Sequence, residues 1–154
     1  MKVRADEHVC ERIVSAVRDI ALTSKFEISS VLGDDRRGAD DVHWITRFAK
    51  EGGHAILTAD TDFLKRPNQV IAILDTGLKI IHLPPKWANA RRELQASHIL
   101  AWWRRIETTI TSCKPRECWR PEWNTSEQGA LHRIMIDYEK HRRKFRKAAR
   151  RSIP

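Results

Sequence analysis

Two hydrophobic periods alternate along the first 85 residues of the chain. Short apolar runs predict strands at residues 2–5, 26–32, 55–58 and 78–83. Between them, apolar residues recur at three- and four-residue spacing, which predicts helices over residues 7–20, from Asp40 or Asp41 to about 51, and over residues 68–74. Strands that alternate with helices are typical of an α/β fold, in which a parallel sheet carries helices on both faces.

Beyond Pro85 the pattern becomes helical. It predicts one helix over residues 87–110, a proline-bounded break over residues 115–123 and a last helix over residues 126–151. We therefore divide the chain into a domain of residues 1–96 and a helical, basic extension of residues 97–154, which packs on that domain and has a frayed or disordered tail. Trp119 and Trp123, in the break, are expected to fasten the last helix to the body.

The charge is distributed unevenly over these two parts. Residues 1–96 hold 15 Lys/Arg and 14 Asp/Glu, whereas residues 97–154 hold 14 Lys/Arg and 6 Asp/Glu. A basic surface beside an acidic one suits chemistry on a polyanion, because the basic groups hold phosphate. The expected phosphate contacts are the eight basic residues near the C-terminus: Lys140, Arg142, Arg143, Lys144, Arg146, Lys147, Arg150 and Arg151.

Composition excludes several other classes of protein. No apolar run approaches the ~20 residues that span a bilayer, so we expect no membrane partner. The three cysteines, Cys10, Cys113 and Cys118, form neither a disulfide framework nor a zinc-ligand spacing. A reducing cytoplasm is the expected compartment.

Carboxylates follow two of the predicted strands. Asp6 comes directly after residues 2–5, and Asp60 and Asp62 come just after residues 55–58. Because the carboxyl ends of parallel strands face one crevice, we expect these side chains to lie close together. Crowded carboxylates raise each other's pKa unless a cation lies between them, and a hard ion such as Mg²⁺ or Mn²⁺ takes carboxylate ligands. The sequence therefore predicts a divalent metal site.

A fourth carboxylate comes from the start of the second predicted helix. Asp40 makes a good N-cap, which would leave Asp41 free to point into the crevice, and we favour this assignment over the reverse. Thr58 and Thr61 flank Asp60 and could orient a ligand through their hydroxyl groups.

The plain alternative to a metal site is turn and cap chemistry. Aspartate is favoured in turns, so Asp60 and Asp62 could shape a turn, and Asp6 could cap the first helix. We prefer the metal site because the two predicted strands that carry these acids should be neighbours in the sheet.

Taken together, these motifs resemble the PIN-like nuclease superfamily. The resemblance is carried by Asp6-Glu7 after the first strand, by Asp41-Val42-His43-Trp44-Ile45 in the central helix and by Thr58-Ala59-Asp60-Thr61-Asp62-Phe63. It covers roughly residues 1–85 and is strongest to the compact branch that includes the VapC-like toxins. Residues 97–154 match no pattern of that family.

The resemblance implies both a fold and an activity. The fold would be a Rossmann-like α/β/α domain with a short parallel sheet of about four strands. The activity would be cleavage of RNA by a Mg²⁺- or Mn²⁺-dependent ribonuclease, with Asp6, Asp41, Asp60 and Asp62 as its catalytic and metal-binding residues. The role would be that of a bacterial toxin, whose partners are RNA, a protein antitoxin and, in a homodimer, a second copy of the chain.

Two other functions stay open. One is a non-catalytic nucleic-acid-binding module, in which the acidic residues are structural. The other is a phosphatase or DNA-repair nuclease of related shape. Phosphatases of that kind need an Asp-x-Asp motif after the first strand, whereas Asp60 and Asp62 follow a later one, which counts against them.

Overall fold

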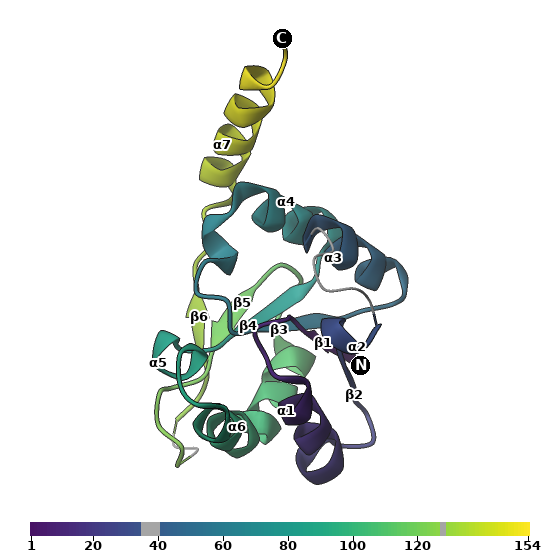
Figure 1. Ribbon diagram of the computed structural model, residues 1–154, viewed down its shortest axis with the longest axis vertical. Coiled ribbons are helices and arrows are strands. Elements are labelled where there is room, and N and C mark those ends of the chain that lie inside the picture. The colour runs from purple at the N-terminus through teal and green to yellow at the C-terminus, as the bar shows by residue number, and fades with distance from the viewer. Residues whose placement is uncertain (35–40, 127–128) are drawn as a thin grey trace.

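Six strands form one sheet in the order β2-β1-β3-β4-β5-β6 (Figure 1). The computed structural model describes residues 1–34, 41–126 and 129–154. Neighbours from β2 to β5 run parallel, and β6 is antiparallel to β5. The strands are β1 (Lys2–Ala5), β2 (Glu27–Ser30), β3 (Ala55–Thr58), β4 (Lys79–His82), β5 (Cys118–Arg120) and β6 (His132–Ile134).

Helices cover both faces of the sheet, which confirms the predicted α/β/α class. On one face lie α1 (Glu11–Ala16), its π-helical continuation η1 (Val17–Ala21) and α6 (Arg92–Ser112); on the other lie α3 (Asp41–Lys50) and α4 (Pro67–Thr76). The remaining helices are α2 (Val31–Asp34), the 3-10 turn η2 (Phe63–Lys65), α5 (Pro85–Ala88) and α7 (Tyr138–Arg151).

The central strand β3 is buried along its whole length. Ala55, Ile56 and Leu57 belong in turn to two hydrophobic clusters on either side of the sheet, and Thr58 is buried as well, so the strand shows no alternation of buried and exposed positions. One cluster includes Trp102 and Trp103 of α6, and the other includes Trp44 and Phe48 of α3. Strand β1 by contrast alternates between more and less exposed positions.

The first helix and strand β2 are shorter than the sequence predicts. The first helix begins at Glu11 rather than at residue 7, because the Asp6 carboxylate accepts a hydrogen bond from the His8 N–H at 3.0 Å and closes a turn. Strand β2 ends at Ser30, whose hydroxyl accepts from the Leu32 N–H at 3.1 Å as the chain turns into α2. In both places a local side-chain hydrogen bond competes with the regular element.

The second half contains strands where helix or break was expected. Strand β5 lies in the predicted break of residues 115–123, and β6 lies within residues 126–151, so the last helix begins only at Tyr138. The sheet has six strands rather than about four. Three-residue strands carry too little sequence to show a period, which is why the pattern missed them.

Helix α6 buries side chains around much of its circumference. Trp102 and Trp103 point about 100° apart on the helix, yet both are fully buried. The indole N–H of Trp102 donates to the Asn124 carbonyl at 2.6 Å, and that of Trp103 donates to the Glu107 carboxylate at 2.8 Å. Trp119 is half-buried, but Trp123 is 60% exposed and does not fasten the last helix to the body.

Charged side chains lie at both edges of the sheet. At the β2 edge, the Arg18 guanidinium donates to the Ile28 carbonyl at 2.8 Å. At the β6 edge, His132 and Arg133 are exposed, and Arg133 lies 3.3 Å from the Glu117 carboxylate.

Helix α7 projects from the body (Figure 1). Asp137 caps it by accepting from the Lys140 N–H at 2.9 Å, and the helix buries no residue of its own. It is anchored beside α4, where Phe145 faces a cavity. No helix within the described ranges is long and apolar enough to cross a membrane.

Candidate active site

Asp6 and Thr58 meet where β1 and β3 end. The register pairs Ala5 with Leu57, and the Asp6 N–H extends the ladder by donating to the Leu57 carbonyl at 3.0 Å. The Thr58 hydroxyl donates to one carboxylate oxygen of Asp6. The other oxygen accepts from the His8 N–H, and Asp6 is only 4% exposed.

Burial changes the acidity of Asp6. Loss of solvation raises the pKa of this carboxyl group to about 6, although hydrogen bonds from Thr58 and His8 and the charge of His8 act in the opposite direction. A buried carboxylate without a full counter-charge favours either a proton or a cation. Asp6 is therefore the acidic side chain of the site best placed to gain from a bound cation.

Asp60 is fixed by its own backbone and by its neighbours. Its N–H donates to the Thr58 hydroxyl at 3.1 Å, so Thr58 connects Asp6 to Asp60. One carboxylate oxygen accepts from the Asp62 N–H at 2.9 Å, and the other accepts from the Arg66 guanidinium at 2.8 Å. The residue is 6% exposed, so its charge is held largely by these two donors.

Arg66 connects Asp60 to Asp41. The same guanidinium nitrogen that bonds Asp60 lies 3.8 Å from a carboxylate oxygen of Asp41. Asp41 is held in place by the Trp44 indole N–H at 3.0 Å and by the side-chain amide of Gln69. The predicted acids Asp6, Asp41 and Asp60 thus form one connected network, with Thr58 and Arg66 as its links.

Asp62 and the other supporting residues lie differently. The Asp62 side chain is 54% exposed and pairs with Lys65 at 2.9 Å, and this hydrogen bond lowers the pKa of its carboxyl group. Its backbone N–H, rather than its carboxylate, contacts Asp60. Thr61 is half-buried, and Asp40 lies outside the described residues.

Four residues of the network were not singled out in the sequence: Arg66, Gln69, His82 and Arg120. His82 Nε2 lies 3.0 Å from the Asp60 carbonyl, and its Nδ1 lies 2.7 Å from the Arg120 guanidinium. Burial and the Arg120 charge lower the pKa of His82 to about 4, so the ring is neutral. Since His82 ends β4, the strand-end argument that located Asp6 could have located it too.

A cavity of about 690 Å³ opens beside Asp6. Glu7, His8 and Arg12 line it from the turn after β1 and from α1, and Ala88 and Arg92 line it from α5 and the start of α6. Arg12, Arg92 and His8 offer contacts for an anionic group in this cavity, although the carboxylates of Glu7 and Glu11 line it as well.

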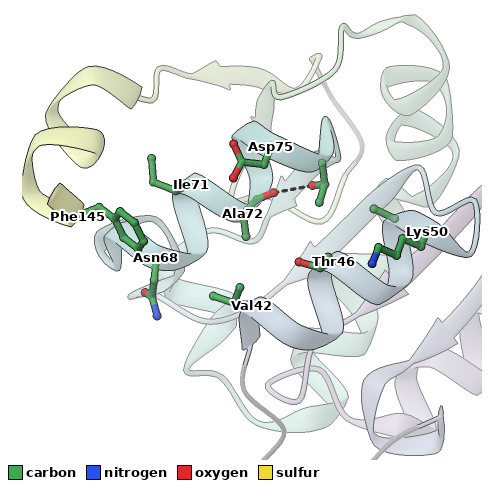
Figure 2. A pocket seen from close by; sticks show the side chains of 10 residues that line it. Val42, Thr46, Lys50, Asn68, Ile71, Ala72, Asp75 and Phe145 are labelled. Carbon is green, nitrogen blue, oxygen red and sulfur yellow. Dashed lines mark hydrogen bonds between the residues drawn. The ribbon is translucent and has the colours of Figure 1, made fainter. Parts of the chain in front are cut away.

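A second cavity, of about 500 Å³, is lined by none of the acids of this network (Figure 2). It lies between α3 and α4, and its lining is mostly apolar. Phe145 of α7 stands beside Asn68 and Ile71 of α4 at one end of it, while Val42 and Thr46 of α3 line the other side. This contact anchors α7 next to the N-terminal end of α4, close in sequence to Arg66.

No three His, Cys, Asp or Glu side chains among the described residues are grouped closely enough to hold one metal ion. The cation that lies between Asp41 and Asp60 in this arrangement is the guanidinium of Arg66.

Comparison of the sequence with known families finds a matching family model. The family model described as PIN like domain matches residues 1–85, which is more than half of the chain and ends just after β4. The chain belongs to the PIN-like domain family. PIN-like domains are in general nucleases and typically use divalent metals, so membership supports a nuclease-type function. No curated protein and no solved structure matches this PIN-like chain.

The raised pKa of Asp6 predicts a pH-dependent difference between wild type and Asp6→Asn in the presence of a chelator. The folded carboxyl group binds its proton up to about pH 6, whereas the ordinary pKa of aspartate, expected in the unfolded chain, is 3.8. The wild type therefore loses stability relative to the variant as pH rises from about 4 to 6, by up to ~3 kcal/mol.

Denaturant unfolding at several pH values measures this difference. The comparison with Asp6→Asn cancels the opposing effect of His82, whose depressed pKa costs stability as pH falls through the same range. A difference that stays constant with pH would show that Asp6 is not protonated in the folded protein at pH 5.

Proposed function

We propose that this protein is a metal-dependent endoribonuclease, which hydrolyses RNA phosphodiester bonds at the carboxyl ends of β1 and β3. The observation that carries the proposal is the buried pair Asp6 and Asp60, joined through Thr58 in a PIN-like domain. Burying two carboxylates at the carboxyl ends of the strands costs folding free energy, and such groups cluster at catalytic sites.

The donor chemistry of the site fits a hard divalent cation. To hold Mg²⁺ or Mn²⁺, the carboxylates of Asp6, Asp41 and Asp60 would have to move closer together than they lie in this arrangement, with Arg66 released from Asp41 and Asp60. The exposed Asp62 would reach the ion through water. Asp6 has a raised pKa that a cation would lower, and Asp60 already binds a cation in Arg66. A bound ion would supply an activated water and neutralise charge on the phosphate.

The residues of the chain have separate tasks in this proposal. Thr58 keeps Asp6 oriented through its hydroxyl group, and the neutral His82 holds the Asp60 backbone. Arg66 neutralises Asp60 and Asp41 in the absence of metal, and its partly exposed guanidinium can turn to a substrate phosphate. The cavity that begins at Glu7 and His8, the residues after Asp6, would leave room for part of the substrate.

The basic side chains of α7 would hold the RNA backbone. All eight of its Lys and Arg residues are exposed, and the helix starts beside α4, whose first turn follows Arg66. Such contacts position a nucleic acid without reading its sequence. The RNA would thus run from α7 past the start of α4 to the acids.

We infer further that the nuclease acts as the toxin of a toxin–antitoxin pair. The motif resemblance supports this role, and the exposed basic helix α7 is suited to an acidic antitoxin. A small partner encoded beside this gene that co-purifies with the protein would identify the antitoxin. A second copy could complete a homodimer, which sedimentation of the purified protein would reveal.

A second candidate function is a nucleic-acid-binding module without catalysis. It is favoured by one observation: Arg66 satisfies Asp60 and Asp41, and Thr58 and His8 satisfy Asp6, without any metal ion. RNA binding by the wild type without cleavage in Mn²⁺ would support this alternative.

The nuclease proposal predicts that cleavage of single-stranded RNA depends on Mn²⁺ or Mg²⁺ and on Asp60. Asp60→Asn keeps the size of the side chain but removes its charge, so we expect a loss of at least ~100-fold in rate. The matched control is Asp75→Asn on α4, because Asp75 lines the second cavity, which none of the acids of the network lines. Gel analysis of labelled RNA measures both, and equal cleavage by the two variants would contradict the assignment of Asp60.

Arg66→Gln should separate stability from metal binding. The change leaves Asp60 with one fewer charged donor, so we expect the metal-free protein to lose ~1–3 kcal/mol of stability. Because the guanidinium no longer competes for the carboxylates, Mn²⁺ should bind more tightly than to wild type. Calorimetric titration with Mn²⁺ measures this; weaker binding would show that Arg66 supports the metal site.

Removal of residues 140–154 should weaken RNA binding and flatten its salt dependence. Each phosphate that α7 no longer neutralises reduces the slope on single strands by about 0.7. The cleavage rate of already bound RNA should change much less, since the acids lie within residues 1–62. An unchanged salt slope would show that α7 serves another purpose.

A further inference from the structure

Three consecutive backbone carbonyls after β5 are each held by a side chain from α5 or α6. His98 Nε2 lies 2.6 Å from the Glu122 carbonyl, the Trp87 indole N–H donates to the Trp123 carbonyl, and the Trp102 indole N–H donates to that of Asn124 at 2.6 Å. The three side chains are buried, so the segment Glu122–Asn124 is fixed in place by the core although it forms no strand or helix.

This fixed segment presents a tryptophan to solvent. Trp123 is 60% exposed, the largest aromatic side chain among the exposed hydrophobic residues of the described chain. The ammonium group of Lys86 lies 4.7 Å from the centre of its ring and 5.4 Å from that of Trp87. Lys86 is itself exposed, so an aromatic ring and a cation lie side by side at the surface.

Trp123 and Lys86 lie at the carboxyl ends of the strands, as the acidic network does. Strands β3, β4 and β5 are parallel neighbours, so the segment after β5 and the helix α5 after β4 leave the sheet where Asp60 follows β3. Arg120, the last residue of β5, reaches the Asp60 backbone through His82. Helix α5 also carries Ala88, which lines the cavity beside Asp6.

We propose that Trp123 and Lys86 form a subsite for single-stranded RNA, in which an unpaired base stacks on the Trp123 indole and Lys86 contacts the adjoining phosphate. This inference rests on the proposed function for its substrate class. An exposed indole on a rigid segment loses little conformational entropy when a base stacks on it. The neighbouring cation favours a ligand that is both aromatic and anionic, which a nucleotide is and an apolar peptide is not.

The subsite gives the enzyme a preference for unpaired RNA. Bases in a duplex are stacked on each other and offer no free face to the indole, whereas any unpaired base does. The preference is therefore for single strands and not for a particular base.

The test is the affinity of the full-length protein for RNA in the presence of a chelator, so that binding is measured without cleavage. Trp123→Ala should weaken binding of a short single-stranded RNA by about 5- to 100-fold and leave duplex binding unchanged. Trp123→Phe should retain most of the affinity because it keeps an aromatic face. The salt slope should be unchanged in both, since tryptophan carries no charge.

Two further variants complete the design. Lys86→Met should reduce the salt slope by about 0.7, the value for one phosphate contact. Ile20→Ala is the matched control: Ile20 is 74% exposed but belongs to η1, which contacts β2, the outer strand farthest from β5 and β6 in the sheet. It should bind RNA as the wild type does.

These binding results test the subsite independently of the proposed nuclease activity. If Trp123→Ala binds single strands as tightly as wild type, or if Trp123→Phe loses as much affinity as Trp123→Ala, the subsite is wrong whether or not RNA is cleaved. A wild type that fails to cleave RNA in Mn²⁺ but shows the expected loss in Trp123→Ala would overturn the nuclease activity and leave the subsite standing.

Discussion

The parallel pairing of β1 with β3 is the constraint on which the site depends. It pairs Ala5 with Leu57, so that the next residues, Asp6 and Thr58, meet at the end of the ladder. A shift of one residue would turn the Thr58 hydroxyl to the other face and leave Asp6 buried with the His8 N–H but without the Thr58 donor. The end of the neighbouring strand β4 adds to this arrangement. The Leu83 N–H donates to the Thr58 carbonyl at 2.9 Å, and His82 contacts the Asp60 carbonyl. The pairing of the central strands therefore positions Asp6 and Asp60 directly.

The family match ends at residue 85, but the sheet does not. The last third of the chain adds β5 beside β4, and Arg120 from this strand completes the hydrogen bonds around His82. Helix α6 fills the face under β1 and β3 with two buried tryptophans. This part of the chain therefore supports the residues of the PIN-like part directly.

The hydrophobic pattern predicted much of the fold, but the sequence did not show which side chains link the acids to each other. The strands around Ile56 and Ile80 have long enough apolar runs to be recognised, and Asp6, Asp41 and Asp60 follow from strand and helix ends. Arg66 escaped notice because nothing in a sequence distinguishes an arginine that bridges two carboxylates from one on a solvated surface. The pairing of β5 with β6 depends on contacts between segments about 14 residues apart, which a local pattern does not record.

The charged edges of the sheet have a consequence for assembly. An unprotected outer strand is a template on which another chain can add by backbone hydrogen bonds. Here Arg18 occupies the Ile28 carbonyl of one outer strand, and the other is only three residues long and carries His132 and Arg133. A continuous sheet across two copies is thereby disfavoured, and the chain is protected from edge-to-edge aggregation at high concentration.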